Sequence, residues 1–227
     1  MRVHVAFTPA EAVRAPTAVV VDVLRATSTI AQALASGYRR VLCCAEVEEA
    51  RALRERLGEG VLAGERRAEP IPGFDLGNSP RELSEPRGES VILTTTNGTR
   101  AIVAAAAHAE TVLVGSLLNL QAVAARAREG GGAVEVVCAG VDGRFTLDDA
   151  YCAGRIAELL AGERSDAAEA AVRLARSFPS AEEALRAAEN PRLERIEDDI
   201  AWCARESVLG VVPRLARMED AAAEIVP

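Results

Sequence analysis

Short apolar runs rich in valine, isoleucine and leucine recur along the first two thirds of the chain. They occupy residues 3–7 (VHVAF), 18–23 (AVVVDV), 40–45 (RVLCCA), 90–95 (SVILTT), 111–116 (TVLVGS) and 133–140 (AVEVVCAG). Because the apolar residues follow one another without strict alternation, each run predicts a strand that is buried on both faces. Such strands are typical of a mainly parallel sheet.

Patterns typical of helices lie between these runs, at residues 28–36, 47–57, 98–107, 119–129 and 147–160. Regular alternation of strand and helix predicts an α/β fold, a layered α/β/α arrangement with helices on both faces of the sheet. From residue 163 onward the pattern indicates helices only, at 165–177, 180–190 and 193–209. We therefore expect one domain over 1–227, with an α/β body at about 1–162 and a helical C-terminal section at about 163–227.

Residues 58–88 break the pattern, because this segment is rich in proline and glycine and has little periodicity. It predicts a long ordered loop, and long loops in compact domains are often functional. Glu65 follows the short apolar run VLAG, and Asp75, Asn78 and Ser79 lie in the stretch GFDLGNSP. These side chains either line a pocket or make Asx-type turns.

The stretch VVVDVLRATSTI places Asp22 at the carboxyl end of a predicted strand, with Arg25, Thr27 and Ser28 in the turn before a helix. In open parallel sheets, ligands bind beyond the carboxyl ends of the strands, where helix N-termini offer free N–H groups. A carboxylate there can hold Mg²⁺, and an arginine and hydroxyls can hold a phosphoryl group. The alternative is a local ion pair between Asp22 and Arg25, with Thr27 or Ser28 as a helix cap.

The stretch TTTNGTRA has the same order of strand, turn and helix. It offers hydroxyls, a side-chain amide and backbone N–H groups to an anion, from Thr95, Thr96, Asn97, Gly98 and Thr99. An ordinary tight turn with Thr99 as the helix cap is the alternative. Because such a turn does not require three threonines, we favour a functional role.

The stretch CAGVDGRFTLDDAYCAG brings Cys138 to a strand end, and Asp148 and Asp149 open the next helix. These two carboxylates either stabilise the helix dipole or bind a hard cation. Cys138 and Arg144 also have the C-x₅-R spacing of cysteine-dependent phosphatases. That short spacing is easily met by chance, and the residue directly before Cys138 is Val137, not histidine, so cysteine chemistry is kept as an alternative.

The amino-acid composition excludes several classes of function for this protein. The chain has 26 basic residues, all of them arginine, and 34 acidic ones, so its formal net charge is −8. This balance gives no broad surface for nucleic acid or an anionic membrane, but it allows a small anionic substrate. The absence of lysine excludes a Walker A loop and Schiff-base chemistry.

The five cysteines form no C-x-x-C pair, no signal peptide precedes them, and the apolar runs are too short to cross a bilayer. These features predict a soluble, cytoplasmic protein with free thiols. His4 and His108 are too few and too scattered for a metal site, whereas Asp199 is a minor candidate for the site. The sequence leaves open whether the chain forms a homo-oligomer.

The motifs DVLRATSTI, GFDLGNSP, TTTNGTRA and CAG…GRFTLDD…CAG occur in an order that resembles the 2-phosphosulfolactate phosphatase family, and the likeness runs almost end to end. The resemblance implies a Mg²⁺-dependent acid phosphatase of α/β fold. It would hydrolyse 2-phospho-3-sulfolactate to 3-sulfolactate and phosphate, a step in coenzyme M biosynthesis. Carried over by motif, the implied site residues are Asp22, Arg25, Thr27, Ser28, Glu65, Asp75, Asn78, Ser79, Thr95, Thr96, Asn97, Gly98, Thr99, Cys138, Gly140, Asp148 and Asp149.

Our hypothesis from the sequence is metal-assisted phosphoryl transfer to water. Mg²⁺ would be held by some of four acids, which are Asp22, Glu65, Asp148 and Asp149. Asp22 would alternatively be the nucleophile of a phospho-aspartate intermediate. The common phosphatases that use such an aspartate have a second one two residues later and an obligatory lysine, but here that position is Leu24 and lysine is absent.

Arginines and the turn at 95–99 would bind the substrate's anionic groups. Arg25 and Asn97 would contact the phosphate, and Arg100 and Arg144 the carboxylate or sulfonate. Two other hypotheses stay open. One is a metal-independent phosphatase that uses Cys138 as nucleophile and Arg144 as phosphate clamp, and the other is a non-catalytic binder of small phosphorylated or sulfonated acids.

Overall fold

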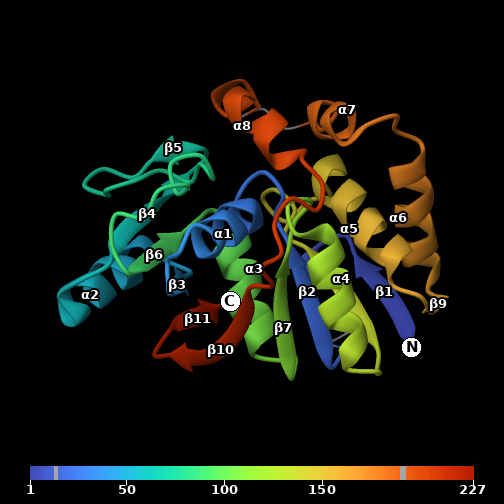
Figure 1. Cartoon of the computed structure of the whole chain (residues 1–227), viewed down its shortest axis with the longest axis horizontal. Helices are drawn as coiled ribbons and strands as arrows, with labels where there is room; N and C mark the ends of the chain where they lie inside the picture. Colours follow the sequence, from blue (N-terminus) through green and yellow to red (C-terminus); the bar gives the residue numbers. More distant parts are fainter. Residues whose placement is uncertain (13–14, 190–192) are drawn as a thin grey trace.

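The computed structural model describes residues 1–12, 15–189 and 193–227, and Figure 1 shows a central sheet with helices packed against it. The strands are β1 (Arg2–Ala6), β2 (Thr17–Val21), β3 (Arg40–Cys44), β4 (Val61–Arg66), β5 (Glu69–Pro70), β6 (Ser90–Thr94), β7 (Thr111–Gly115), β8 (Val134–Cys138), β9 (Glu163–Arg164), β10 (Arg214–Glu219) and β11 (Ala222–Val226). Their order across the sheet is β5-β4-β6-β3-β11-β10-β7-β2-β8-β1-β9. Strand β2 pairs in parallel with β7 and β8, and β3 with β6, so the sheet is mainly parallel, as predicted.

The helices of the described part lie largely where the sequence predicts them. They are α1 (Ala26–Ala35), α2 (Val47–Leu57), α3 (Gly98–Ala106), α4 (Leu120–Glu129), α5 (Leu147–Leu159), α6 (Asp166–Arg176), α7 (Ala181–Arg186) and α8 (Glu197–Cys203), with short 3₁₀ helices η1 (Pro9–Glu11) and η2 (Leu193–Arg195). Helix α2 shows why helix boundaries can be predicted from the sequence. It begins at a capping box between Glu46 and Glu49 and ends at Gly58, whose φ is 70°. None of the helices that the structure describes has the length and apolar character to cross a membrane.

Strand β2 is buried on both faces, which explains its continuously apolar sequence. Val19 and Val21 pack in a core with residues of α4, α5 and α6. Val20 points to the opposite face and packs in a second core with Ile30 of α1 and Ile102 of α3. The chain therefore leaves β2 between two layers of helices, at the point where the candidate site lies.

The expectation of helices alone after residue 163 is wrong. Strand β9 pairs with β1, and β10 and β11 form an antiparallel hairpin that lies in the sheet between β3 and β7. The helix predicted at 193–209 is limited to η2 and α8, after which Ser207 and Leu209 donate backbone hydrogen bonds to Leu117 and Leu118. Helix α7 ends at Arg186, while the predicted end at 190 lies outside the described residues.

The long loop predicted at 58–88 contains a strand. Strand β4 pairs in parallel with β6, and a two-residue turn at Arg67 and Ala68, both with positive φ, leads into β5. Gly64 interrupts the apolar pattern because β4 approaches β6 closely: a Cβ there would lie 2.1 Å from the Thr94 carbonyl oxygen. The rest of the segment, residues 71–88, is irregular, as predicted.

Candidate active site

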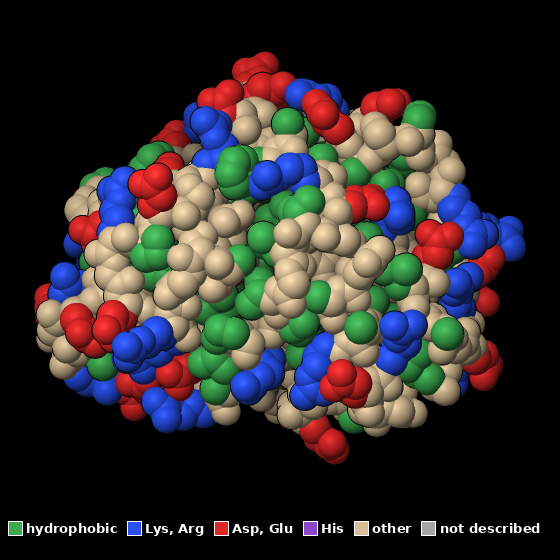
Figure 2. All heavy atoms as spheres, viewed as in Figure 1, with side chains coloured by type: hydrophobic (Ala, Val, Ile, Leu, Met, Phe, Trp, Pro, Cys, Tyr) green, Lys and Arg blue, Asp and Glu red, His purple; other side chains and the backbone are tan. Residues whose placement is uncertain are grey.

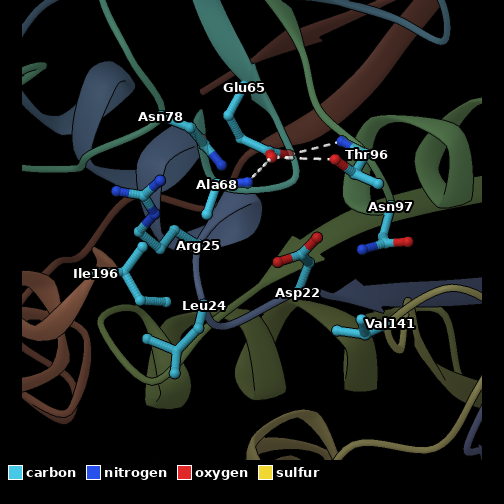
Figure 3. A pocket seen from close by; sticks show the side chains of 10 residues that line it. All are labelled: Asp22, Leu24, Arg25, Glu65, Ala68, Asn78, Thr96, Asn97, Val141 and Ile196. Carbon is cyan, nitrogen blue, oxygen red and sulfur yellow. Dashed lines mark hydrogen bonds between the residues drawn. The ribbon is translucent and has the colours of Figure 1, made fainter. Parts of the chain in front are cut away.

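A small pocket lies at the carboxyl ends of β2, β4 and β6, beside the loop that follows β8 (Figure 3). Its free volume is about 30 Å³, which is room for roughly two water molecules. The lining residues are Asp22, Leu24, Arg25, Glu65, Ala68, Asn78, Thr96, Asn97, Val141 and Ile196. In Figure 3 the Asp22 carboxylate lies in the middle of this ring, between Arg25 on one side and Asn97 on the other.

Asp22 follows β2 directly and is buried between the N-termini of α1 and α3. Its Oδ1 accepts a hydrogen bond from the Ala26 N–H at 3.1 Å, and no described residue donates one to Oδ2. Gly98 is the first residue of α3, and a Cβ there would lie 2.5 Å from Oδ2, so glycine is needed for this close approach. The pKa of Asp22 is raised from 3.8 to about 7, mainly by burial, and the charges of Glu65 and Asp148 contribute to this increase.

Glu65 ties the end of β4 to the turn after β6. Its Oε1 accepts a hydrogen bond from the Thr96 N–H at 2.7 Å. Its Oε2 accepts hydrogen bonds from the Ala68 N–H at 2.6 Å and from the Thr96 hydroxyl at 3.0 Å. Figure 3 shows these three bonds converging on the carboxylate. Glu65 thus lines the pocket, but three donors from the chain already occupy its oxygens.

Arg25 brings a positive charge to the pocket from the turn before α1. Its Nη1 lies 2.6 Å from Asp199 Oδ2, and both side chains are buried, with exposed fractions of 10% and 5%. The Ser79 hydroxyl donates a hydrogen bond to Asp199 Oδ1 at 2.6 Å. The local ion pair between Asp22 and Arg25 considered from the sequence is therefore replaced by a pair with the distant α8.

In the turn after β6, some side chains line the pocket and others form hydrogen bonds within the turn. Thr96 and Asn97 line the pocket. Thr95 and Thr99 bind each other: the Thr95 N–H donates to the Thr99 hydroxyl at 3.0 Å, and the Thr99 N–H to the Thr95 hydroxyl at 3.1 Å. Asn97 Oδ1 accepts a hydrogen bond from the Asp142 N–H at 3.2 Å, which joins this turn to the loop after β8.

The hydroxyls at the start of α1 hold the backbone. Thr27 Oγ1 donates to the Asp22 carbonyl at 2.9 Å and accepts from the Asp22 N–H at 3.1 Å, while Ser28 Oγ donates to the Val23 carbonyl at 2.8 Å. Both side chains are fully buried and neither lines the pocket. Asn78 lines it, and its buried Oδ1 has no hydrogen-bond partner among the described residues.

Asp148 and Asp149 at the start of α5 lie close to Asp22 without lining the pocket. Asp149 accepts hydrogen bonds from the N–H groups of Val23 and Gly140, each at 2.9 Å, and so ties together the loops after β2 and β8. Burial raises the pKa of both aspartates, and for Asp149 the charges of Asp148 and Asp22 add to the effect. Asp148 Oδ1 is buried without a hydrogen-bond partner among the described residues.

Four further candidate residues also lie outside the pocket. Asp75 is exposed and accepts a hydrogen bond from the Leu62 N–H at 2.8 Å, and Arg100 is half-exposed and pairs with Glu46. Cys138 is buried, and burial raises the pKa of its thiol well above the ordinary value. Arg144 is exposed and lines a neighbouring cleft of about 880 Å³, which shares Val141 with the pocket.

The described residues contain no preformed cluster of three or more histidine, cysteine, aspartate or glutamate side chains for a metal ion. Glu65 and Asp149 are occupied by hydrogen-bond donors of the chain. Among the residues that line the pocket, Asp22 Oδ2 and the buried Asn78 Oδ1 accept no hydrogen bond from the described chain. This set fits Mg²⁺, which keeps several waters and is commonly held by one or two carboxylates together with substrate phosphate oxygens.

Comparisons with known proteins identify the family of the chain. The family model described as 2-phosphosulpholactate phosphatase matches residues 4–218. A 2-phosphosulfolactate phosphatase of Methanothermobacter thermautotrophicus is 40% identical over 213 residues, which are 89% of this chain and 90% of the relative. A probable 2-phosphosulfolactate phosphatase of Carboxydothermus hydrogenoformans is 38% identical over 221 residues, covering 94% and 92%. Because the match extends over nearly the whole sequence, the chain belongs to the 2-phosphosulfolactate phosphatase family.

Proposed function

We propose that this protein is a phosphatase that hydrolyses 2-phospho-3-sulfolactate, or a closely similar phosphorylated hydroxy acid, to the hydroxy acid and phosphate. The observation that carries the proposal is the position of Asp22, Arg25 and Asn97 around one pocket at the N-termini of α1 and α3. Helix N-termini and arginines bind anions, and they stabilise the charge that develops on a phosphoryl group during its transfer. The names of the relatives support the same substrate, whose product would belong to coenzyme M biosynthesis, as the motif resemblance implies.

We propose Mg²⁺ as the cofactor. Asp22 Oδ2 and Asn78 Oδ1 would hold it, because they are the pocket oxygens without a donor from the described chain. When bound, Mg²⁺ would supply positive charge to the phosphate oxygens. Glu65 contributes by fixing Thr96, and Asp149 contributes by fixing the loops on either side of Asp22.

The phosphoryl group would lie between Arg25 and Asn97, where the guanidinium and the amide donate hydrogen bonds to its oxygens. The apolar part of the lining consists of Leu24, Ala68, Val141 and Ile196, which would exclude bulk water from the phosphate. The pocket is too small for a whole three-carbon acid, so the remaining part of the substrate would lie in the neighbouring cleft. That cleft contains Arg144, a counter-charge for a carboxylate or sulfonate.

The cysteine mechanism has less support. A nucleophilic cysteine needs a lowered pKa and access to the substrate, whereas Cys138 is buried and its pKa is raised. The Arg144 carbonyl and N–H are bonded to Val141 and close a tight loop, and the side chain is exposed instead of facing the sulfur. We therefore assign Cys138 a place in the core.

The proposal is tested by phosphate release from 2-phosphosulfolactate and from a panel of phosphorylated hydroxy acids, with Mg²⁺ and after treatment with EDTA. We expect turnover with Mg²⁺, and at least about a hundredfold loss on removal of the metal. Activity that survives EDTA but disappears in Cys138→Ser would establish the cysteine mechanism instead. Binding of the panel without turnover of any member would identify a non-catalytic binder.

A further inference from the structure

The pocket's arginine is supported by a chain of buried polar side chains that the proposed chemistry does not use. Arg25 is the basic residue among those that line the pocket in the described chain. Behind it, Asp199 accepts from Arg25 Nη1 through Oδ2 and from the Ser79 hydroxyl through Oδ1, both at 2.6 Å. These three residues are far apart in the sequence, so the contact exists only in the folded protein.

Asp199 is anchored independently of Arg25. It lies in the first turn of α8, where its N–H donates to the Ile196 carbonyl at 2.9 Å. Ser79 is anchored by its own loop, since its Oγ also accepts from the Arg81 N–H at 3.2 Å. The neighbouring Asn78 carbonyl accepts from the Thr29 hydroxyl of α1 at 2.9 Å. The Asp199 carboxylate is therefore held in place by α8 and by the Ser79 loop, independently of its contact with the Arg25 guanidinium.

One hydrogen bond to Asp199 uses only part of the guanidinium. The group has five N–H donors in a rigid plane, and Asp199 occupies a donor on Nη1. No described residue accepts from the remaining donors, so they can bind an anion in the pocket, which Arg25 also lines. Fixing the plane in advance lowers the entropic cost of binding, because a free arginine side chain has many rotamers.

We propose that Asp199 and Ser79 are positioning residues, which hold the Arg25 guanidinium in the orientation that binds the phosphate. This inference rests on the proposed function for its choice of anion. Asp199 acts through Arg25 and does not touch the substrate. The competing arrangement is that Asp199 occupies Arg25 in place of the substrate and must be displaced, which predicts the opposite effect on affinity.

The test compares Asp199→Asn and Ser79→Ala with Asp198→Asn as a matched control. Asp198 is the adjacent acid, but its side chain is 87% exposed and pairs with Arg81 at the surface. Two quantities are measured with Mg²⁺ present: steady-state KM and kcat for 2-phosphosulfolactate, and the Kd of inorganic phosphate by calorimetry. The second measurement does not depend on turnover.

We expect Asp199→Asn to raise both KM and the phosphate Kd by about tenfold or more, with a smaller fall in kcat. Ser79→Ala should shift both constants in the same direction but less, and Asp198→Asn should leave them within about twofold of wild type. In an Arg25→Ala background, Asp199→Asn should have no further effect on either constant, because its action passes through the guanidinium. A merely structural role would lower the fraction of active protein instead, without this dependence on Arg25.

Unchanged or lowered KM and phosphate Kd in soluble, folded Asp199→Asn would overturn the proposal, and a lowered Kd would establish the competing arrangement. An additive effect of Asp199→Asn in the Arg25→Ala background would also overturn it. Should wild type bind phosphate but turn over no substrate, with weaker binding in Asp199→Asn, the proposed function fails while the positioning role stands.

Discussion

Replacing Asp22 with asparagine removes a buried charge from the centre of the pocket and should make the metal-free protein more stable at neutral pH. Burial raises the pKa of Asp22 from 3.8 to about 7, which corresponds to about 4 kcal/mol at 1.36 kcal/mol for each pKa unit. The folded state binds this proton more tightly than the unfolded state. Protonation of Asp22 therefore contributes to the free energy of unfolding in full below pH 4, and this contribution is lost as the pH rises through 7. Asparagine has no such proton, and its carbonyl can still accept from the Ala26 N–H.

The assay is urea unfolding of wild type and Asp22→Asn in EDTA, followed by circular dichroism between about pH 4 and pH 8. The variant should gain stability relative to wild type across this range, by about 2–4 kcal/mol at pH 8, while the exposed Asp198→Asn should show no trend. Mg²⁺ at about a hundred times its Kd should stabilise wild type by about 3 kcal/mol and leave Asp22→Asn unchanged. A flat difference between wild type and Asp22→Asn over the whole range would refute the argument that burial perturbs this carboxylate.

Three further substitutions separate roles within the site. Cys138→Ser should keep kcat, measured by phosphate release, within about threefold of wild type, because a buried thiol does not take part in the reaction. Complete loss of activity in a folded variant would contradict this. Glu65→Gln should lower the free energy of unfolding by about 1–3 kcal/mol, since an amide NH₂ would face the Ala68 N–H at the position of Oε2; unchanged thermal unfolding would contradict it. Arg144→Ala should raise KM for 2-phosphosulfolactate more than for a phosphate ester that has no second acidic group, and equal effects on both substrates would remove Arg144 from substrate binding.

The parts of the fold that the sequence predicts well are those where burial and local hydrogen bonds act together. Strand β2 is an example, since its unbroken valines are required by helices on both faces. Helix α2 is another, because its capping box and terminal glycine are local signals. The hairpin β10–β11 gives no such signal. Its alanines favour a helix on propensity, and its two strands form because they pair with each other and with β7 and β3.

In the site, too, the residues with local sequence signals were predicted and those that depend on tertiary contacts were not. The motifs bring Asp22, Arg25, Glu65, Asn78, Thr96 and Asn97 to one pocket, and the rule that ligands bind at strand carboxyl ends accounts for that. The apolar lining residues Leu24, Ala68, Val141 and Ile196 were not predicted, because an aliphatic side chain at a strand end looks the same as one in the core. Asp199 was weighed only as a minor candidate, since no sequence pattern relates it to Arg25 across 174 positions.

The four candidate metal ligands Asp22, Glu65, Asp148 and Asp149 differ in their hydrogen bonds, which the sequence does not show. Glu65 and Asp149 accept backbone N–H groups and hold neighbouring loops in register. Asp22 keeps one oxygen without a donor from the described chain, and Asp148 keeps a buried oxygen without a partner. All four are carboxylates at strand ends or helix starts, and the sequence does not show which backbone N–H groups they accept, so the sequence could not separate them.

The balance of charge in the pocket leads to an order of binding. The formal net charge is −8, and Figure 2 shows acidic and basic side chains interspersed on the face in view, so no broad positive field draws a phosphate ester toward the protein. Within the pocket, Arg25 is paired with Asp199, while Asp22 and Glu65 add negative charge. Without a cation, these groups offer an incoming phosphate little net attraction beyond the N-termini of α1 and α3.

A divalent cation at Asp22 would reverse this balance, so phosphate should bind tightly only after Mg²⁺. We expect calorimetry with inorganic phosphate to give a Kd at least about tenfold weaker in EDTA than in excess Mg²⁺. In Asp22→Asn the phosphate Kd should lose most of this dependence on Mg²⁺, since the carboxylate that would hold the cation is gone. Equal affinity with and without Mg²⁺ in wild type would mean that Arg25 and the helix N-termini suffice to bind the anion, and Asp22 would then have to act as a nucleophile or a base.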